Sequence, residues 1–539
     1  MGKRLYHHGN LLTMDPARPR AEAVLTENGI ILGVGTAEEL RPLAGEGAMQ
    51  RDLEGRTMLP GFIDPHSHLT AAANQRLMVN AAPPPLGICG DRAALLETFR
   101  KGLETREREP GEWLIGMGYD PSGFPEGEEI TRLELDQVSE EIPVLCIHAS
   151  GHLVIGNTRA LQLLGYWGQF QVPEGGTVGR FPDGTPNGLL TERAYLDPSV
   201  QAKIQSPSFE KVIASMEQTC EMYASYGITT IQDARVGKEE LRLLRAGEER
   251  GLFFQDVVGQ VTPELAESLL SGAPSDGGRV RMAGCKLFLD GSPQGKTAWL
   301  SRPYEIPPEG EGADYCGAPL YIDEEVTALA VRCLERGWQM NVHCNGDAAC
   351  EQFLRCYARA MERTGIRRPL RPVMIHAQTV RPDQLERMKA LGMMASFFLD
   401  HVYYWGDWHA RSVLGAARAA SISPARGALM RGVPFTLHQD TPVVPPNMLF
   451  TVQNAVCRKT LSGRVLGPAE RLTAAQALQA VTATAAYQIF EEHRKGSIMP
   501  GKLADFVILG DDPTQVPAEQ IGQIPVLETI KEDKIIFKA

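Results

Sequence analysis

The chain has 539 residues, enough for several domains or for one large barrel with additions, and its 43% hydrophobic and 22% charged residues are ordinary for a globular protein. A formal net charge of −12 disfavours a nucleic-acid binder, because such proteins usually present a basic face to phosphates. No apolar run approaches the roughly 18 residues of a membrane span, the N-terminus lacks an apolar signal segment, and the ten cysteines occur without a CxxC pair, so we expect a cytoplasmic protein with reduced thiols and no membrane partner.

Both ends of the chain have the pattern of β-strands. Near the N-terminus, AEAVLTENGIILGVG places the Asn28-Gly29 pair between two apolar runs, which is a strong signal for a two-residue hairpin. Near the C-terminus, KLADFVILGDD and PVLETIKEDKIIFKA contain short β-branched runs separated by charged turns. The two ends are therefore expected to pair into one small sheet domain.

The long middle of the chain alternates apolar runs with helical patterns, such as those of residues 323–337 and 381–392. Alternating strands and helices indicate a parallel sheet, and about eight such units indicate a (β/α)8 barrel. The eight predicted strands are residues 58–64, 227–234, 252–259, 283–290, 339–344, 372–377, 393–398 and 433–440.

About 150 residues separate the first two predicted strands, which is far more than a barrel requires. This region, residues 70–220, contains the strand-like pieces WLIGMGYD and IPVLCIHASGH and a glycine-rich stretch typical of a hairpin, EGGTVGRFPDGTPNGLL. Barrels tolerate large insertions at the face that carries the active site. We interpret residues 70–220 as an inserted subdomain that covers the substrate; the alternative is an independent domain with its own function.

Six side chains fall at the carboxyl ends of the predicted barrel strands, where barrel enzymes build their active sites. In the stretch GFIDPHSHL, two histidines lie two positions apart and so share one face of a strand. Imidazole and carboxylate suit zinc and related divalent ions. The predicted metal ligands are His66, His68, Lys286, His343, His376 and Asp440.

Each of these residues also has an ordinary structural explanation. A single buried histidine is more often a hydrogen-bonded interior residue, and Asp440 could cap the following helix. Lys286 could form a salt bridge with Asp290 or with a carboxylate of the substrate. Alternatively, burial near cations lowers a lysine pKa, and a neutral amine can add carbon dioxide to form a carbamate that bridges two metals. The coincidence of all six positions favours metal binding.

The motifs GFIDPHSH, CKLFLDG, NVHCNGDAA, VMIHA and HQDTPV resemble those of the amidohydrolase superfamily. Together with DGSPQGKTAWLSRPY, HLVIGNTRAL and GSIMPGKLADFVIL, they are most similar to its YtcJ-like branch (amidohydrolase family 3), which includes N-substituted formamide deformylases. The resemblance covers nearly the whole chain. It implies a (β/α)8 TIM barrel as the catalytic domain, residues 61–491, and a composite β-sandwich domain formed by residues 1–60 plus 492–539.

The resemblance also implies how the ligands are shared. His66, His68 and Asp440 would hold the more buried metal, and His343 and His376 the more exposed one. Lys286 would carry a carbamate made from carbon dioxide. The implied cofactor is a pair of divalent ions, zinc in the first place, although manganese, iron or cobalt suit the same ligands.

The chain departs from the family pattern at two places. Where relatives commonly have a GSD-like triplet, this chain has LHQD, so that His438 shares the inward face with Asp440 and is either a hydrogen-bond partner of a ligand or a steric wall. After strand 7, FFLDHVYYWGDWH replaces a Gln-Pro pair. The candidates for contact with the substrate are His152, Trp299, His401, His438 and the aromatic residues Tyr403, Tyr404 and Trp405.

The expected reaction is hydrolysis of an amide-type C–N bond, such as that of an N-formyl or N-acyl group, in a small-molecule substrate. Asp440 would be the general base that takes a proton from the nucleophilic water and returns it to the departing nitrogen. Three alternatives stay open: a single-metal deaminase of a cyclic substrate, an ester or lactone hydrolase, and a non-catalytic regulatory protein on the same fold. Apolar faces on the barrel helices would also suit a homodimer.

Overall fold

A computed structural model describes residues 2–106, 108–121, 124–125, 129–149, 151, 153–174, 176–205, 207–269, 278–308 and 310–539. The chain divides into two compact units, one made of Met1–Thr70 with Glu217–Ala539 and the other of Ala71–Met216. The second unit occupies most of the segment between the first two predicted barrel strands. The substrate-covering role of this segment stays a prediction.

Eight parallel strands form a nearly closed barrel in the first unit, and each strand pairs with the next along the chain. The two outermost strands also meet, because the His68 N–H donates a hydrogen bond to the Thr441 carbonyl oxygen over 2.8 Å. This arrangement confirms the predicted barrel as a TIM-barrel-like α/β fold. The barrel strands are β8 (Phe62–Ser67), β15 (Ile228–Val236), β16 (Asp256–Val261), β17 (Val280–Phe288), β18 (Gln339–Cys344), β19 (Val373–His376), β20 (Met394–Phe398) and β21 (Phe435–His438).

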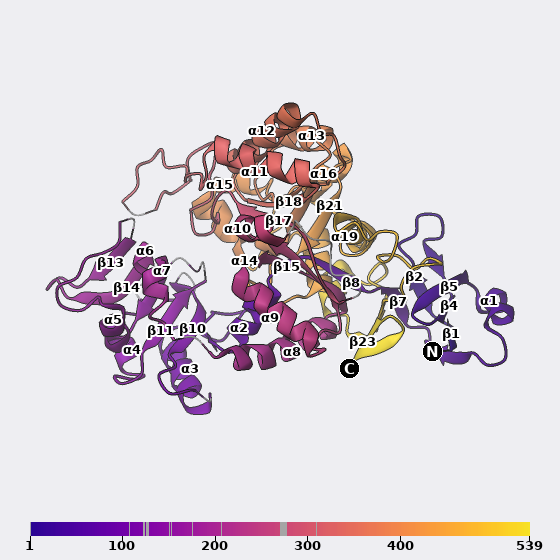
Figure 1. Cartoon of the computed structure of the whole chain (residues 1–539), viewed down its shortest axis with the longest axis horizontal. Helices are drawn as coiled ribbons and strands as arrows, with labels where there is room; N and C mark the ends of the chain where they lie inside the picture. Colours follow the sequence, from indigo (N-terminus) through magenta and orange to yellow (C-terminus); the bar gives the residue numbers. More distant parts are fainter. Residues whose placement is uncertain are drawn as a thin grey trace. The chain divides into compact units, whose positions relative to one another are not determined.

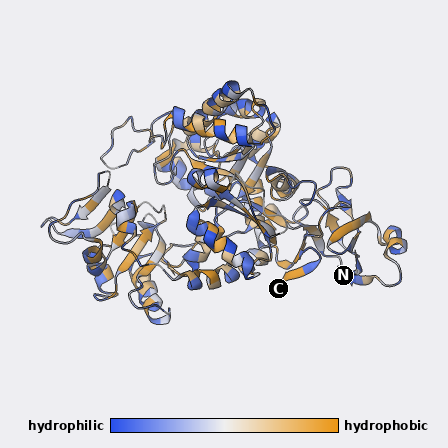
Figure 2. Ribbon diagram, viewed as in Figure 1, coloured by the Kyte–Doolittle hydropathy of each residue, from blue (hydrophilic) through white to orange (hydrophobic). Residues whose placement is uncertain are grey.

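Helices follow the barrel strands, as expected for this fold, and Figure 2 shows the strands mostly in hydrophobic colours and the helices with mixed faces. Helix α11 illustrates the local signals: three acidic residues lie in its first turn, and Gly337 ends it with a φ of 78°. Among the described residues, none of the helices combines the length and apolarity needed to cross a membrane. The helices include α8 (Phe209–Ser225), α9 (Lys238–Glu249), α10 (Pro263–Leu269), α11 (Asp323–Arg336), α12 (Asp347–Thr364), α13 (Pro382–Ala390), α14 (Asp400–Trp408), α16 (Ala425–Arg431), α17 (Met448–Cys457), α18 (Ala474–Ala480) and α19 (Ala483–Gln488).

The first predicted barrel strand, residues 58–64, is in fact parts of two strands. Residues Thr57–Pro60 form β7, which belongs to a different sheet, and the barrel strand β8 begins at Phe62. The chain changes sheets at Gly61, whose N–H donates to the Asp505 carbonyl oxygen over 2.9 Å. A Cβ at Gly61 would lie 2.3 Å from Thr229 Cγ2, so the close approach requires glycine. The apolar run is continuous across this change of sheet, and hydropathy therefore did not reveal the break.

One of the two other sheets in the first unit combines strands from both ends of the chain, the second contains N-terminal strands alone, and Figure 1 shows the N-terminal strands beside the C-terminal strand β23. The predicted hairpin joins β4 and β5, with φ angles of 52° at Asn28 and 83° at Gly29, as a type I′ turn requires. Residues from both sheets, such as Tyr6, Met58 and Phe506, share one apolar core. The strands are β1 (Lys3–His7), β4 (Ala23–Glu27), β5 (Ile30–Gly35) and β6 (Met49–Asp52) in one sheet, and β2 (Asn10–Leu12), β3 (Arg20–Ala21), β7 (Thr57–Pro60), β22 (Phe506–Leu509), β23 (Val526–Lys531) and β24 (Lys534–Lys538) in the other.

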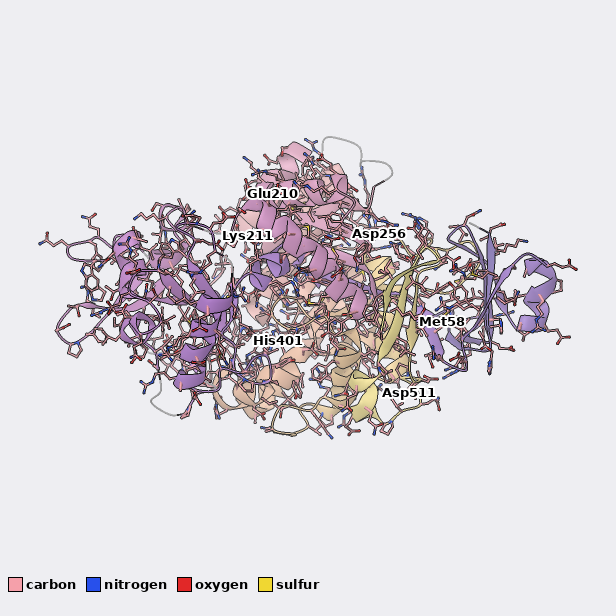
Figure 3. The ribbon with its side chains drawn as sticks, turned by 90° about the horizontal axis from the view of Figure 1, so that it is seen from below. Met58, Glu210, Lys211, Asp256, His401 and Asp511 are labelled. Atoms are coloured by element: carbon pink, nitrogen blue, oxygen red, sulfur yellow. The ribbon has the colours of Figure 1, made fainter. Side chains whose placement is uncertain are left out.

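A buried cluster of charges joins the barrel to these sheets at the start of β16. Asp256, labelled in Figure 3, pairs with Lys495 and lies 3.0 Å from Lys531 Nζ, and Lys531 Nζ lies 2.9 Å from Asp505 Oδ2. Burial alone would raise the pKa of Asp256, but the two lysines hold it well below its usual range. The cluster ties the barrel to β23 and lies at the end of the strands opposite to the predicted site.

The second unit is built on its own six-stranded sheet, in the order β13-β14-β12-β11-β10-β9. Alternate residues of its strands face two separate apolar cores: Leu114 and Val144 face one, and Ile115 and Leu145 the other. Helices α3 (Arg92–Thr105) and α5 (Thr158–Leu164) cover the sheet. The strands are β9 (Val79–Asn80), β10 (Leu114–Tyr119), β11 (Val144–His148), β12 (Leu153–Gly156), β13 (Gly176–Arg180) and β14 (Pro186–Glu192).

Candidate metal centre

The six predicted ligands come from the carboxyl ends of β8, β17, β18, β19 and β21. Because these strands are parallel members of one barrel, their carboxyl ends open at the same mouth. In the barrel, side chains alternate between the interior and the surrounding helices, and the HxH spacing of His66 and His68 sends both imidazoles inward. The structure brings the nitrogen and oxygen atoms of these side chains together in two adjoining groups.

The first group consists of His66, His68 and Asp440. His66 Nε2 lies 3.1 Å and His68 Nε2 3.2 Å from Asp440 Oδ1, and the three potential ligand atoms lie within 4.8 Å of one another. Burial lowers the pKa of His66 well below its usual value, so its imidazole is neutral. Burial alone would raise the pKa of Asp440, but the two histidines hold it well below the usual range. Neutral imidazoles beside an ionised carboxylate are a typical zinc ligand set.

The second group consists of His343 and His376. His343 Nδ1 lies 3.1 Å from His376 Nε2, and His343 Nε2 lies 3.0 Å from the Gly291 carbonyl oxygen. Asn345 Nδ2 also lies 3.0 Å from His343 Nε2, but it donates to the Gly291 carbonyl oxygen over the shorter distance of 2.9 Å. Since that oxygen only accepts, we assign the hydrogen to His343 Nε2 and the lone pair to Nδ1. Burial lowers the pKa of His343 to about 4 and that of His376 well below its usual value. Both rings are therefore neutral and able to bind a cation.

The amine of Lys286 is buried inside the barrel. Its side chain is 2% exposed, and Nζ has no hydrogen-bond partner among the described residues. Burial lowers the pKa of Lys286 to about 7, although the negative charge of Asp440 acts to raise it. A buried amine without a partner is unfavourable as an ammonium ion, so a chemical role is more consistent with this setting than a structural one.

The alternative of a salt bridge between Lys286 and Asp290 is not what the structure shows. Asp290 instead accepts hydrogen bonds from the backbone N–H groups of Asn345 over 3.0 Å, Gly346 over 2.7 Å and Trp299 over 3.0 Å. Burial raises the pKa of Asp290 to about 7 despite these bonds. Asp290 therefore fastens the loop after β17 onto the end of β18, and this loop supplies the carbonyl oxygen that orients His343.

Two of the predicted ligands have an unusual backbone. His376 has a φ of 67° and Asp440 a φ of 60°, both in the left-handed region that L-residues other than glycine rarely adopt. Such a conformation costs on the order of 1–3 kcal/mol and persists where the surroundings impose it. Concentration of strain at two of the six predicted ligands is typical of a functional site.

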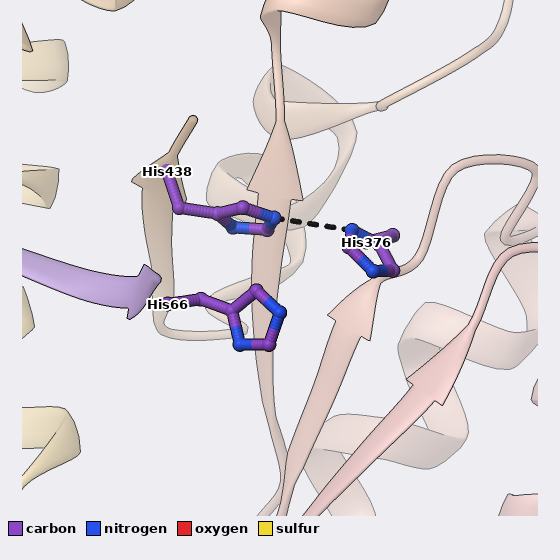
Figure 4. A group of neighbouring side chains, drawn as sticks. All are labelled: His66, His376 and His438. Atoms are coloured by element: carbon purple, nitrogen blue, oxygen red, sulfur yellow. Dashed lines mark hydrogen bonds between the residues drawn. The ribbon is translucent and has the colours of Figure 1, made fainter. Parts of the chain in front are cut away.

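His438 lies two residues before Asp440, and Figure 4 shows its ring close to those of His66 and His376. His438 Nε2 lies 3.1 Å from His376 Nδ1, and its Nδ1 lies 2.8 Å from Ser396 Oγ. Burial lowers the pKa of His438 to about 3, so the ring is neutral. Its nearest ligand atom, together with those of His66 and His376, forms a third group within 4.8 Å.

His401, like His438, is a predicted substrate-contacting residue whose ring lies beside that of the ligand His376. Its ring, labelled in Figure 3, is 3% exposed and lies 6.3 Å from that of His376 and 4.1 Å from that of Phe398. Its Nδ1 has no hydrogen-bond partner among the described residues. The ring of Trp405 lies 5.6 Å from His401.

The other candidates are less clearly part of this group. Trp299 is half-buried in the loop fastened by Asp290, and among the described residues its side chain forms no hydrogen bond or ring contact with a predicted ligand. Tyr403 and Tyr404 pack against each other and against Phe450. His152 lies outside the described residues.

Sequence reasoning missed the polar residues behind His438, namely Ser396, Thr436 and Gln488. Thr436 Oγ1 lies 2.9 Å from Ser396 Oγ and 2.7 Å from Gln488 Oε1. Ser396 and Thr436 lie two residues before Phe398 and His438, so strand alternation could have placed them on the inward face. Gln488 lies at the end of α19, and no local pattern in the sequence marks it.

The residues present fit a pair of divalent cations. Two groups of imidazole nitrogens and one ionised carboxylate converge, and a buried amine without a hydrogen-bond partner among the described residues belongs to the same barrel interior. Lone pairs that face one another without intervening hydrogens repel unless a cation lies among them. The donor set, rich in imidazole with a carboxylate, is that of zinc and related metals.

Comparison with known proteins agrees with this geometry. The profile described as Amidohydrolase family matches residues 51–537. The chain is 28% identical over 552 residues to an N-substituted formamide deformylase of Arthrobacter pascens, covering 97% of this chain and 96% of the relative, and 26% identical over 560 residues to the YtcJ protein of Bacillus subtilis, covering 99% of each. A solved structure titled as an uncharacterized metal-dependent hydrolase from Pyrococcus horikoshii superposes with a TM-score of 0.77 at 24% identity, covering 96% of this chain and 99% of that one.

Proposed function

We propose, since the chain belongs to the amidohydrolase family, that it is a metal-dependent hydrolase that cleaves an amide-type C–N bond in a small molecule. N-formyl and N-acyl amines are the substrates we propose first, because a formamide deformylase is among the relatives that match nearly the whole chain. The observation that carries the proposal is the meeting of two groups of neutral imidazoles, one carboxylate and one buried amine at the mouth of the barrel.

Two zinc ions are the proposed cofactor. His66, His68 and Asp440 would hold one ion, and His343 and His376 the other. When bound, such ions lower the pKa of water from about 15.7 to about 7 and polarise a carbonyl oxygen. The remaining steps depend on the side chains of this chain.

Lys286 is proposed to carry a carbamate, whose two oxygens would add to the ligands that hold the metal. With its pKa lowered to about 7 by burial, a large share of the amine is neutral near neutral pH. The neutral nitrogen adds to carbon dioxide, an N–C bond forms, and one proton leaves to solvent. The resulting anion offers two oxygens in place of an ammonium ion that contacts the Phe288 ring but has no hydrogen-bond partner among the described residues, which gives a reason for a lysine in this position.

Asp440 is proposed as the general base. It is ionised, and its Oδ2 is the oxygen farther from the HxH histidines, 3.9 Å from His376 Nε2. Asp440 takes a proton from the attacking water, the water oxygen bonds to the substrate carbonyl carbon, and Asp440 returns the proton to the nitrogen as the C–N bond breaks. The products are a carboxylic acid, formic acid for an N-formyl substrate, and the free amine.

His401 and Trp405 are proposed to line the substrate side of the site. Both belong to α14, directly after the end of β20, and His401 contacts the ring system of Phe398 and His376. Aromatic walls with a few polar groups are usual in sites for small ligands. The pair would therefore favour an apolar or aromatic group on the nitrogen of the substrate.

The proposal is tested by metal content and hydrolysis together. Three proteins are purified without chelator: wild type, Lys286→Ala and the control Lys296→Ala. Lys296 is a lysine in the loop after β17 that lies over the Trp408 ring. We expect about two ions per chain in wild type and the control, a sharp fall in Lys286→Ala, and release of amine from N-formyl or N-acyl amines by wild type and the control. About one ion per chain, unchanged in Lys286→Ala, would contradict the two-metal centre and favour a single-metal deaminase.

A further inference from the structure

A chain of hydrogen bonds with a fixed direction connects Gln488, at the end of α19, with His438. It begins at Gln488, whose Nε2 lies 2.8 Å from the Pro65 carbonyl oxygen. Because that oxygen only accepts, the amide nitrogen of Gln488 must face it, and Gln488 Oε1 must face Thr436. Thr436 Oγ1 lies 2.7 Å away and therefore donates its single hydrogen to Gln488 Oε1.

The direction continues through two hydroxyl groups. Thr436 Oγ1 is also oriented to donate to Ser396 Oγ, 2.9 Å away, but it has one hydrogen, and Gln488 Oε1 can only accept. The shorter contact with Gln488 takes that hydrogen, which leaves Ser396 to donate to Thr436. Ser396 Oγ then has only acceptor capacity for His438 Nδ1, 2.8 Å away. His438 is therefore protonated on Nδ1, and its Nε2 presents a lone pair.

That lone pair determines the tautomer of His376. His438 Nε2 lies 3.1 Å from His376 Nδ1, so Nδ1 of His376 carries the hydrogen and donates it (Figure 4). His376 Nε2 consequently presents a lone pair towards His343 Nδ1, 3.1 Å away, which also has a lone pair because its Nε2 donates to Gly291. Two neutral nitrogen lone pairs face each other at this distance, an arrangement that a cation between them stabilises.

We propose that His438 is a positioning residue that holds His376 in the tautomer and orientation needed to bind the second metal ion. The inference rests on the proposed function, because it requires that His343 and His376 hold a metal. Histidine ligands commonly donate their second ring N–H to an acceptor that fixes the ring, and loss of such an acceptor weakens metal binding by about 10–100-fold. In this chain the acceptor is itself a histidine, whose own state is set by Ser396, Thr436 and Gln488.

Direct ligation by His438 is the competing arrangement, since its nearest ligand atom lies within 4.8 Å of those of His66 and His376. In that arrangement His376 Nδ1 would need a lone pair, and its Nε2–H would donate to His343 Nδ1. His343 would then be lost as a ligand. The positioning role keeps both nitrogens available and is therefore favoured.

The test uses two variants of His438 and measures metal affinity by competition with a chelator, with circular dichroism as the check of folding. His438→Gln keeps an oxygen to accept from His376 and an amide N–H to donate to Ser396. His438→Phe keeps a ring of similar size, which can still stack on Phe398 as His438 does at 5.6 Å, but removes both polar ends. We expect His438→Phe to lose about 10–100-fold in affinity for one of two ions, and His438→Gln to retain most of it.

A second pair of variants keeps the test decisive if His438→Phe does not fold. Ser396→Ala removes the acceptor that fixes His438, and Ser423→Ala removes another fully buried hydroxyl, which has no hydrogen-bond partner among the described residues. We expect Ser396→Ala to lower the affinity for the same ion and Ser423→Ala to bind both ions with the affinity of wild type.

Three results would overturn the inference: wild-type affinity in His438→Phe, wild-type affinity in Ser396→Ala, or a loss in His438→Gln as large as in His438→Phe. The last would indicate direct ligation. Wild-type protein that binds no divalent metal would instead overturn the proposed function, so the two failures are distinguishable.

Discussion

The substitution Asp440→Asn separates metal binding from catalysis. Asp440 Oδ1 lies 3.1 Å from His66 Nε2 and 3.2 Å from His68 Nε2, so the amide oxygen of asparagine can occupy nearly the same position beside the same ligands. What the amide cannot do is accept a proton at neutral pH. The variant therefore keeps most of the geometry of the first ligand group and loses the base.

Loss of a general base typically costs about 10²–10⁴-fold in rate, which corresponds to ~3–5 kcal/mol in the activation barrier. We expect a decrease of this size in kcat, with a much smaller change in metal content. The assay is release of amine from an N-formyl or N-acyl amine at saturating metal, with metal content measured on the same sample. Turnover within about tenfold of wild type by a metal-loaded Asp440→Asn protein would refute the assigned role.

Asp64→Asn is the matched control, because Asp64 is a second buried carboxyl group on the same strand as the HxH motif. Its Oδ1 accepts from the His66 N–H over 3.3 Å, and burial raises the pKa of Asp64 to about 8. In the metal-free protein this group is therefore neutral at pH 7, and an amide replaces it without removing a charge. The control should bind metal and retain most of its activity.

Two further predictions concern stability. In the metal-free protein, Asp64 has a pKa of about 8, above its value of about 3.9 in the unfolded chain. Between these two pH values the folded state holds a proton that the unfolded state releases. The free energy of unfolding of wild type therefore falls as pH rises, by about 1.4 kcal/mol per pH unit. Urea unfolding of Asp64→Asn should therefore show a gain relative to wild type that grows from pH 5 to pH 7, and a pH-independent difference would contradict the raised pKa. At Gly346, a Cβ would lie 1.8 Å from the Trp299 carbonyl oxygen, so Gly346→Ala must displace the loop after β17 and should reduce the free energy of unfolding by about 1–3 kcal/mol. Unfolding of Gly346→Ala at the wild-type urea midpoint would show that the loop moves without a loss in the free energy of unfolding, which would contradict this prediction.

The sequence by itself was informative about the barrel and about where its polar side chains would meet. Apolar runs that alternate with helical patterns predicted eight strands, and the structure has a barrel strand in each predicted segment. Only the first predicted strand, residues 58–64, covers parts of two strands, because the apolar run continues through Gly61 from one sheet into another. Hydropathy records that a segment is buried but not which sheet buries it.

The HxH pair of His66 and His68 could be interpreted from local spacing alone, because residues two apart on a strand face the same side. His343, His376 and Asp440 followed from the rule that the carboxyl ends of parallel barrel strands share one mouth. These predictions required no knowledge of contacts, only of strand direction.

The tertiary structure alone decided the chemical state of these groups. Burial keeps His66, His343 and His376 neutral and lowers the pKa of Lys286 to about 7, and burial depends on what the rest of the chain packs around each side chain. The hydrogen-bond chain from Gln488 to His438 joins residues from different strands and from α19, and its direction follows from one carbonyl oxygen at Pro65. Periodicity along the chain specifies which face a side chain occupies, but its protonation and its partners are set by neighbours that are distant in sequence, and only the folded chain brings those together.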